Sequence, residues 1–340
     1  MTDANTTMHV LYVSKTQGVH DDRWTSAMRT SGCTVTPLQI DPTDGDALSA
    51  VERLVPELGI DVVVAGPLTT CTKSLVGISV PLVGLSWGFD LHQMADGERT
   101  SDSTWMTALA GLIVDSESTR MIAEGFGVES DRIELIPWGV DLEAFHPDGP
   151  RGTHPALPST ARVVLSARAH EPLYRVGDIV AAFENGRNIW DDDAYLVVVN
   201  DGPLTPDFQA SAGDRTLFIG RVAEEDLAAW LRRSDVYVSA SETDGSSVTL
   251  LQAMACGAPV LVSDIPGNRE WIRDGVNGRL FPLGDIEALT ASLAELLTNT
   301  GDLARTAQAL TEVRARADWS RNSPRLCALL QRVSGLPPDE

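Results

Sequence analysis

Twelve short apolar runs, most of them rich in valine, isoleucine and leucine, alternate with helix-like stretches along almost the whole chain. They are MHVLYVS (8–14), CTVTPLQ (33–39), DVVVAG (61–66), PLVGLSW (81–87), GLIVDS (111–116), RIELIPW (132–138), ARVVLSA (161–167), AYLVVVN (194–200), RTLFIG (215–220), SDVYVSA (234–240), APVLVS (258–263) and GRLFP (278–282). Runs of this length and composition predict strands that are buried on both faces. The alternation of such strands with helices predicts an α/β fold built on parallel sheets.

A segment without periodicity divides these runs into two groups of six. Residues 140–160, VDLEAFHPDGPRGTHPALPST, hold four prolines, a composition typical of a linker between domains. We therefore expect two doubly wound, Rossmann-like domains, over residues 1–150 and 151–317. Residues 318–340 are expected to form a last helix and tail, with a break near Pro324.

Ligands of open parallel sheets bind at the carboxyl ends of the strands, so two such domains predict a cleft protein. A dinucleotide oxidoreductase would share this architecture, but no Gly-x-Gly-x-x-Gly follows a predicted strand. The glycines of residues 125–127 instead close a helix predicted over 116–125. A Walker phosphate-binding loop is also missing from the sequence.

The charge balance excludes several classes of partner. The chain carries 26 basic and 48 acidic residues, a net charge of −22, and Lys15 and Lys73 are its only lysines. Such a surface repels nucleic acid and anionic lipid, so an anionic ligand needs a local site. Two origins of this composition stay open, adaptation to a salty cytoplasm and a high-GC genome that favours arginine.

No run approaches the roughly 18 apolar residues of a membrane span, and MTDANTTMHV has no basic region of a signal peptide. We therefore expect a cytoplasmic protein without a membrane span; peripheral association and oligomeric state stay open. The four cysteines lie at positions 33, 71, 256 and 327, without Cys-x-x-Cys spacing. Free thiols are expected from this spacing, with neither a disulfide framework nor a metal site.

The stretch SETDGSSVTLLQAMACGAPVLVSDIPGNREW (241–271) carries the strongest functional signal. Gly245, Ser246 and Ser247 occupy a turn between a predicted strand and a helix that begins near Ser247. Free backbone N–H groups and the positive end of the helix make such a turn an anion site. A serine that only caps the helix is the alternative. Asp244, just before the turn, is suited to sugar hydroxyls rather than to phosphates.

This stretch resembles retaining glycosyltransferases of family four, which have the GT-B fold. Members carry an acid, seven residues, and then a glutamate in an EAMA-x-G-x-P-V helix, where this chain has Asp244 and Gln252 in QAMACGAPV. SDIPGNREWIRDGVNGRLFPLGD (263–285) and LIPWGVDLEAFHP (135–147) match two further family patterns. The resemblance covers roughly residues 110–335.

The resemblance implies a nucleotide diphosphate sugar, a UDP- or GDP-sugar, as donor. Asp244 would bind hydroxyls of the donor sugar, and the amides of residues 245–247 would face the sugar and the phosphates. Gln252 replaces the glutamate that holds the ribose, which should weaken this grip by about 1 kcal/mol per hydrogen bond, near a tenfold loss. No metal or other cofactor is implied.

Further donor-side residues follow from the same resemblance. Arg168 matches the arginine that holds the diphosphate, and Arg175 is the nearest substitute for the usual lysine. Arg221 and Val222 correspond to the loop that meets the base. Glu270 matches the family's second glutamate, although an acid at a helix start, serving the dipole, is an alternative reading.

The acceptor side departs further from the family pattern. Where members often have His-Gly-x-Asp, this chain reads Trp87-Gly88-Phe89-Asp90, so Trp87 replaces the histidine. Asp90 and His20 are the predicted acceptor-side residues. His92 is a candidate to compensate for the missing histidine, and a surface histidine without this role is the alternative.

We therefore expect an enzyme that transfers a sugar to an acceptor hydroxyl with retention of the anomeric configuration. The acceptor would be a glycan, a lipid-linked molecule or a small molecule, bound by the N-terminal domain. By the resemblance, the last helix returns to that domain and the cleft closes about residues 140–160. A binding protein that has lost catalysis and a GT-B sugar-nucleotide epimerase stay as alternatives, the first because Gln252, the missing lysine and the missing histidine depart from the family.

Overall fold

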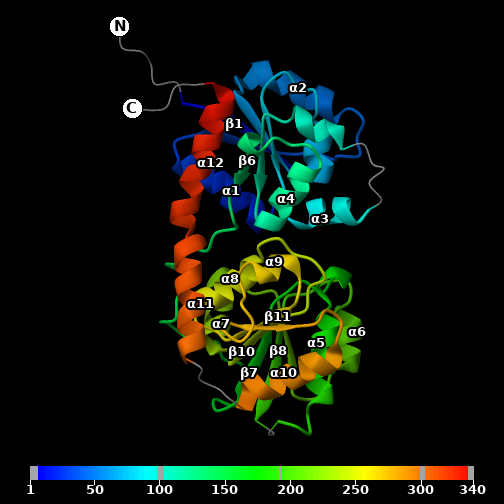
Figure 1. Ribbon diagram of the computed structural model, residues 1–340, viewed down its shortest axis with the longest axis vertical. Coiled ribbons are helices and arrows are strands. Elements are labelled where there is room, and N and C mark those ends of the chain that lie inside the picture. The colour runs from blue at the N-terminus through cyan, green and yellow to red at the C-terminus, as the bar shows by residue number, and fades with distance from the viewer. Residues whose placement is uncertain (1–6, 98–102, 191–192, 299–302, 336–340) are drawn as a thin grey trace. The chain divides into compact units, whose positions relative to one another are not determined.

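The computed structural model describes residues 7–97, 103–190, 193–298 and 303–335. The chain forms two compact units (Figure 1). Unit 1 consists of the residues up to Pro137 together with those from Ser320 onward, and unit 2 consists of Trp138–Trp319.

Unit 1 is built on a six-stranded parallel sheet with the strand order β2-β1-β3-β4-β5-β6. Its strands are β1 (His9–Ser14), β2 (Thr34–Gln39), β3 (Val62–Gly66), β4 (Leu82–Leu85), β5 (Gly111–Val114) and β6 (Ile133–Leu135). Its helices are α1 (Val19–Thr30), α2 (Ala47–Leu58), α3 (Phe89–Asp96), α4 (Glu117–Gly125) and α12 (Trp319–Ser334), with short helical turns over Leu68–Thr72, Thr104–Ala108 and Ser130–Arg132. Every residue of β3, β4 and β5 is buried, which explains why these strands contain almost only aliphatic residues and small ones.

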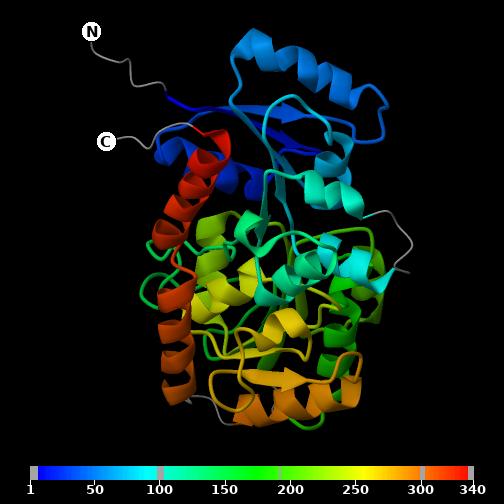
Figure 2. The same cartoon turned by 45° about the horizontal axis from the view of Figure 1, so that its top comes forward.

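Unit 2 repeats this architecture with the strand order β12-β11-β10-β7-β8-β9. Its strands are β7 (Arg162–Ser166), β8 (Ala194–Val199), β9 (Thr216–Gly220), β10 (Val236–Ser239), β11 (Val260–Ser263) and β12 (Arg279–Phe281). Its helices are α5 (Val176–Asn185), α6 (Thr205–Ser211), α7 (Glu224–Arg233), α8 (Val248–Ala255), α9 (Pro266–Arg269), α10 (Ile286–Thr298) and α11 (Leu303–Arg316), with a helical turn over Pro172–Tyr174. In Figure 2, α10 lies beside β12, the strand that precedes it.

Alternate residues of the strands in unit 2 feed two separate apolar cores. Val163 and Leu165 of β7 belong to a cluster with residues of α7, α8 and α11. Val164, between them, packs on the other side of the sheet with residues of α5 and α10. Both faces of the sheet are therefore covered, and only the ends of the strands remain for polar side chains.

The predicted α/β class and all twelve predicted strands are confirmed, each within two or three residues of its expected bounds. The helix expected over 116–125 also forms, as α4. The stretch 284–317 contains α10 and α11, and residues 299–302 between them lie outside the described residues.

The domain boundary expected at residue 150 is wrong, because the chain passes to unit 2 already after Pro137. Val140 and Phe145 are fully buried in the apolar cluster around α8. Arg232 of α7 donates from Nε to the carbonyl of Pro150 at 2.8 Å. These contacts attach the first half of the expected linker firmly to unit 2.

The two places where the chain passes between the units are joined to each other. The N–H of Val140 donates to the carbonyl of Ala317 at 2.7 Å, and the N–H of Trp319 donates to the carbonyl of Val140 at 3.2 Å. A Cβ on Gly139 would lie 2.4 Å from the Trp319 ring, so only glycine allows this approach. The chain therefore passes between the units at residues 137–138 and 319–320, and not within residues 140–160, where the hinge was expected.

The expected break near Pro324 is also wrong, since α12 continues through this residue. The helix break lies instead at residues 317–318, between α11 and α12. Proline removes one backbone hydrogen bond, and the buried side chains of Leu326, Leu329 and Leu330 offset that loss. Arg325 adds an ion pair of 2.8 Å to Glu134, so α12 packs against β6 of unit 1.

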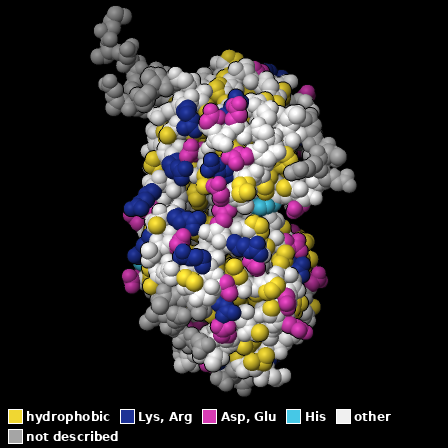
Figure 3. Space-filling model, viewed as in Figure 1, with side chains coloured by type: hydrophobic (Ala, Val, Ile, Leu, Met, Phe, Trp, Pro, Cys, Tyr) yellow, Lys and Arg dark blue, Asp and Glu magenta, His cyan; other side chains and the backbone are white. Residues whose placement is uncertain are grey.

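Three of the four cysteines are buried, Cys327 is half-buried, and all are free thiols, as expected. On the face shown in Figure 3, basic and acidic side chains are interspersed. No helix within the described ranges is long and apolar enough to cross a membrane.

Replacing Phe145 by alanine tests the revised boundary. Because Phe145 is fully buried in unit 2, we expect Phe145→Ala to lower the free energy of unfolding of this unit by about 3–5 kcal/mol. Hydrogen exchange measured by mass spectrometry should then accelerate in peptides of unit 2 and stay unchanged in unit 1. Glu143→Ala, at an exposed site nearby, is the control. Equal exchange rates in Phe145→Ala and wild type would mean that the segment around Phe145 is a linker and not a part of unit 2.

Candidate functional site

The strand order of unit 2 creates a crevice between β7 and β10. From β7 the chain proceeds to β8 and β9 on one side of the sheet, and then returns to place β10 on the other side. The loops that follow β7 and β10 therefore diverge at their carboxyl ends, which is where open α/β sheets bind ligands. Arg168 follows β7, and Asp244 lies in the loop between β10 and α8.

Arg168 and Asp244 meet at this crevice in a bidentate ion pair. Nη2 of Arg168 donates to both carboxylate oxygens of Asp244, at 2.9 and 3.0 Å, and Nη1 donates to Ser247 Oγ at 2.6 Å. The guanidinium carbon also lies 4.2 Å from the centroid of the Tyr174 ring, a cation–π contact. These contacts together fix the orientation of the Arg168 guanidinium.

Arg168 is only 8% exposed. Burial disfavours its charged form, but Asp244 together with Tyr174 and Tyr237 outweighs this effect, and the pKa of Arg168 is raised above its ordinary value. A charged guanidinium is therefore held permanently at the end of β7.

The turn of residues 245–247 leads into α8, as the sequence indicated. Ser247 is the N-cap residue, and its side chain accepts a hydrogen bond from the N–H of Leu250. Ser246 and Ser247 are each 4% exposed. The serine cap and the anion site were alternatives in the sequence; the cap is present, and its hydroxyl also contacts Arg168.

Polar side chains from the neighbouring strand hold the loop after β10. Ser263, the last residue of β11, donates to the carbonyl of Ser241 at 2.6 Å, and Asn268 donates to the carbonyl of Ser263 at 2.8 Å. A Cβ on Gly267 would lie 2.2 Å from the carbonyl oxygens of both Asp244 and Gly245. The loop thus lies against α9 at a distance that only glycine permits.

Arg175 lies at the start of α5 in the left-handed region, with φ of 45°. This conformation is strained for a residue with a side chain. Its guanidinium donates to Glu242 at 2.9 Å and to Asp178 at 2.7 Å, and these hydrogen bonds, with Glu242 the larger cause, raise the pKa of Arg175. Glu242 follows β10, so Arg175 borders the same crevice as Arg168.

The remaining donor-side candidates are more dispersed. Gln252 is 6% exposed on α8, and its side-chain amide has no hydrogen bond to a described residue. Arg221 and Val222 follow β9, the edge strand, and the exposed Arg221 pairs with Asp201 at 2.6 Å. Glu270 follows α9 and ends it, so the alternative of an acid at a helix start is wrong.

In unit 1, Asp90 is fully buried and accepts four hydrogen bonds. They come from the N–H groups of Leu68, Trp87 and Leu91 and from Ser86 Oγ. Burial raises the pKa of Asp90, and these hydrogen bonds oppose that rise. This burial corrects the expectation that Asp90 contacts an acceptor: the carboxyl holds the loop before α3 in place.

The two histidines of the acceptor side lie near this loop. His20, exposed on α1, packs edge-on against the Trp87 ring with 5.7 Å between ring centroids. His92, on α3, lies 3.4 Å from Ser118 Oγ through Nε2. Of the two histidines, His20 is therefore the one that contacts Trp87, the residue at the position of the family's histidine.

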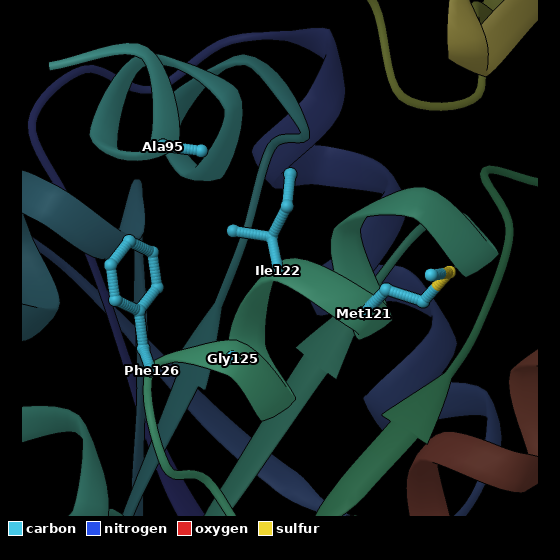
Figure 4. Close-up of a pocket in the computed structure, with 5 residues that line it drawn as sticks. All are labelled: Ala95, Met121, Ile122, Gly125 and Phe126. Carbon is cyan, nitrogen blue, oxygen red and sulfur yellow. The ribbon is translucent and has the colours of Figure 1, made fainter. Parts of the chain in front are cut away.

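Two hollows lie in unit 1, away from the residues described above. One, of about 230 Å³, lies between α3 and α4 and is lined by Ala95, Met121, Ile122, Gly125 and Phe126 (Figure 4). A second, of about 490 Å³, is lined by Lys15, Gln39, Ile40, Asp41 and Thr43 after β1 and β2. Within the described part of the chain, no three His, Cys, Asp or Glu side chains gather in a way that could hold a metal ion.

Sequence reasoning missed Tyr174, Ser263, Asn268 and Trp271. Trp271 donates from Nε1 to Ser246 Oγ at 3.1 Å. Each of these residues acts through a partner at least 5 residues away, and usually through one on another loop. Only the position of Ser263 at a strand end could have indicated its role.

Comparison with known structures identifies the architecture as GT-B. The chain superposes on sucrose-phosphate synthase from Thermosynechococcus elongatus with a TM-score of 0.75, covering 97% of this chain and all of that one at 16% identity. Anabaena HepE, solved in complex with UDP, gives a TM-score of 0.72 over 96% of this chain at 15% identity.

Residues 160–299 match the family described as glycosyl transferases group 1. A phosphatidyl-myo-inositol mannosyltransferase of Mycobacterium leprae is 31% identical over 68% of this chain and 61% of its own length. A D-inositol 3-phosphate glycosyltransferase of Xylanimonas cellulosilytica is 29% identical over 59% of this chain and 52% of its own length. The chain thus spans between half and two thirds of these two relatives.

Gly267→Ala tests the close approach of α9 to the loop after β10. Because a Cβ would overlap two backbone oxygens, we expect a loss of about 1–3 kcal/mol of stability in urea unfolding. Gly125→Ala is the matched control, since no atom lies within 4 Å of its added Cβ. An unchanged midpoint for Gly267→Ala would show that the loop yields freely.

Proposed function

We propose that this protein is a retaining glycosyltransferase that moves a sugar from a nucleotide diphosphate sugar to an acceptor hydroxyl. The observation that carries the proposal is the buried, permanently charged Arg168, joined to Asp244 and to the N-cap serine of α8 at the crevice of unit 2. A cation and a helix N-terminus at one place suit the pyrophosphate of such a donor. The match of residues 160–299 to glycosyl transferases group 1 supports the same activity.

Unit 2 is the proposed donor domain. Arg168 and the N–H groups of residues 245–247 would stabilise the departing diphosphate, with Arg175 as a second cation. Asp244 would accept hydrogen bonds from hydroxyls of the donor sugar. Gln252, buried and without a described partner, would bind the ribose, and the loop of Arg221 and Val222 would lie beside the base. Glu270 completes the set on the sugar side.

The reaction would proceed on one face of the sugar. The acceptor oxygen bonds to the anomeric carbon as the bond from that carbon to the diphosphate oxygen breaks, and the acceptor's proton passes to the departing phosphate. The anomeric configuration is retained without a protein nucleophile, and the two arginines supply the positive charge that a metal ion would otherwise provide. Unit 1 would bind the acceptor, with His20 and His92 as its candidate side chains and Asp90 positioning their loop.

The donor is proposed to be a UDP- or GDP-sugar. Anabaena HepE was solved with UDP-glucose as well as with UDP, which supports a nucleoside diphosphate donor in this fold. The second candidate is a binding protein without turnover, which Gln252 and the replacement of the family's histidine by Trp87 favour.

Arg168→Ala tests the proposal directly. Incubation with a panel of UDP-, GDP- and ADP-sugars should release nucleoside diphosphate from one donor, and Arg168→Ala should slow this release by about 100-fold or more. Arg187→Ala is the control, because Arg187 also bridges two acids in unit 2, namely Glu184 and Asp214. Thermal stabilisation by a donor without turnover would favour the binding protein. If no donor is turned over and none stabilises the protein, the assignment is overturned.

Gln252→Glu tests the ribose contact. A charged acceptor forms stronger hydrogen bonds than a neutral one, so we expect the variant to bind the nucleoside diphosphate about five- to tenfold more tightly. Isothermal titration calorimetry measures this change. Weaker binding by Gln252→Glu would mean that the amide donates a hydrogen bond to the ligand.

A further inference from the structure

A buried indole supports the proposed donor turn from behind. Trp271 Nε1 donates to Ser246 Oγ at 3.1 Å, and the two residues are 2% and 4% exposed. Trp271 lies just after α9, within the apolar cluster that includes residues of α8 and α11. The indole is therefore a rigid partner for a side chain in the middle of the turn.

Arg316, the last residue of α11, fixes the indole in turn. Its guanidinium carbon lies 4.2 Å from the centroid of the Trp271 ring. Nη1 of the same side chain donates to the carbonyl of Glu270 and to Glu312, both at 2.8 Å. The ring is thus held by its cation–π contact while the backbone just before it is held by a hydrogen bond.

The same segment contacts the turn at a second place. Gly267 approaches the carbonyl oxygens of Asp244 and Gly245 closely enough that a Cβ there would lie 2.2 Å from each. Residues 267–271 therefore support the start of the turn through the backbone at Gly267 and its middle through the side chain of Trp271.

We propose that Trp271, braced by Arg316, is a positioning residue for donor binding. By fixing Ser246, it keeps the N–H groups of residues 245–247 directed at the diphosphate, so that no reorganisation is needed when the donor binds. This inference rests on the proposed function. It predicts that loss of the indole N–H raises the KM for the donor while the volume of the ring only affects stability.

A double-mutant cycle separates positioning from packing. Trp271→Phe keeps an aromatic ring and removes the indole N–H that donates the hydrogen bond. Ser246→Ala removes the hydroxyl oxygen that accepts it. Each should raise the KM for the donor about three- to tenfold, the effect of one neutral hydrogen bond. Because both changes remove the same bond, the double variant should be no worse than either single variant. Additive effects of the two changes would overturn the inference.

Trp190→Phe is the matched control for the loss of an indole in unit 2. Trp190 is 6% exposed, and its Nε1 has no partner in the described structure. It belongs to the apolar cluster on the other face of the sheet. Trp190→Phe should lower the melting temperature and leave the KM unchanged; an equal rise in KM would show that any cavity in unit 2 has the same effect.

A second variant keeps the test valid if Trp271→Phe does not fold. The side chain of Arg316 is 40% exposed, so Arg316→Met should fold normally. It should raise the KM for the donor about twofold to threefold with little change in kcat, and Arg316→Lys should restore much of the loss because a cation can still stack on the ring. An unchanged KM for Arg316→Met would overturn the proposed role of Arg316 in fixing the Trp271 ring.

A readout without ligand separates this inference from the proposed function. The chain has eight tryptophans, and the indole N–H signal of Trp271 is assigned in a ¹⁵N spectrum as the one that Trp271→Phe removes. Ser246→Ala should shift that signal, and the absence of a shift would overturn the contact itself. If Ser246→Ala shifts the signal but the wild-type protein neither binds nor turns over any donor, the proposed function alone is overturned.

Discussion

The ion pair between Arg168 and Asp244 is the contact on which the site in unit 2 depends. Taking a guanidinium out of water costs several kcal/mol unless its N–H groups are satisfied, and here three hydrogen bonds and the Tyr174 ring meet that demand. Removing one partner would leave a buried charge behind. For the proposed reaction the pair also defines the starting state, because a diphosphate that engages these N–H groups must replace at least one bond to Asp244 or Ser247.

The topology of the sheet explains why these residues can meet. Arg168 and Asp244 are 76 positions apart, and the pairing of β7 with β10 places the ends of their strands side by side. The loop after β11, the next strand, then reaches the turn from the opposite side through Gly267 and Trp271. Three loops that follow three adjacent strands therefore build the site, and a change in any one of them is transmitted to the turn through contacts of glycine, serine or indole.

The strands and the capped helix could be predicted because their signals are local. Valine-rich runs define a buried strand wherever they stand, and Ser247 follows a strand and precedes an apolar helix. The boundary at 150 could not be predicted, because Phe145 stands in a proline-rich segment and the apolar cluster in which it is buried includes residues of α8, more than 100 positions later. From its motif Asp90 was expected to contact an acceptor, yet it is buried, and its four hydrogen-bond donors come from the helical turn after β3, from the residues after β4 and from α3. The role of Trp271 depends on a serine 25 positions earlier, which no periodicity records.

The charges around the crevice explain why binding of an anionic donor depends on the geometry of the turn as well as on the two arginines. Arg168 and Arg175 already face three carboxylates, those of Asp244, Glu242 and Asp178. The local side chains therefore present no surplus of positive charge, in a chain whose net charge is −22. An anionic donor must then displace a partner of these arginines to engage them, and it also needs the fixed dipoles of the backbone N–H groups and of the α8 N-terminus, whose contribution depends on their direction. A turn held by Gly267, Ser247 and the indole maintains that direction before any ligand arrives.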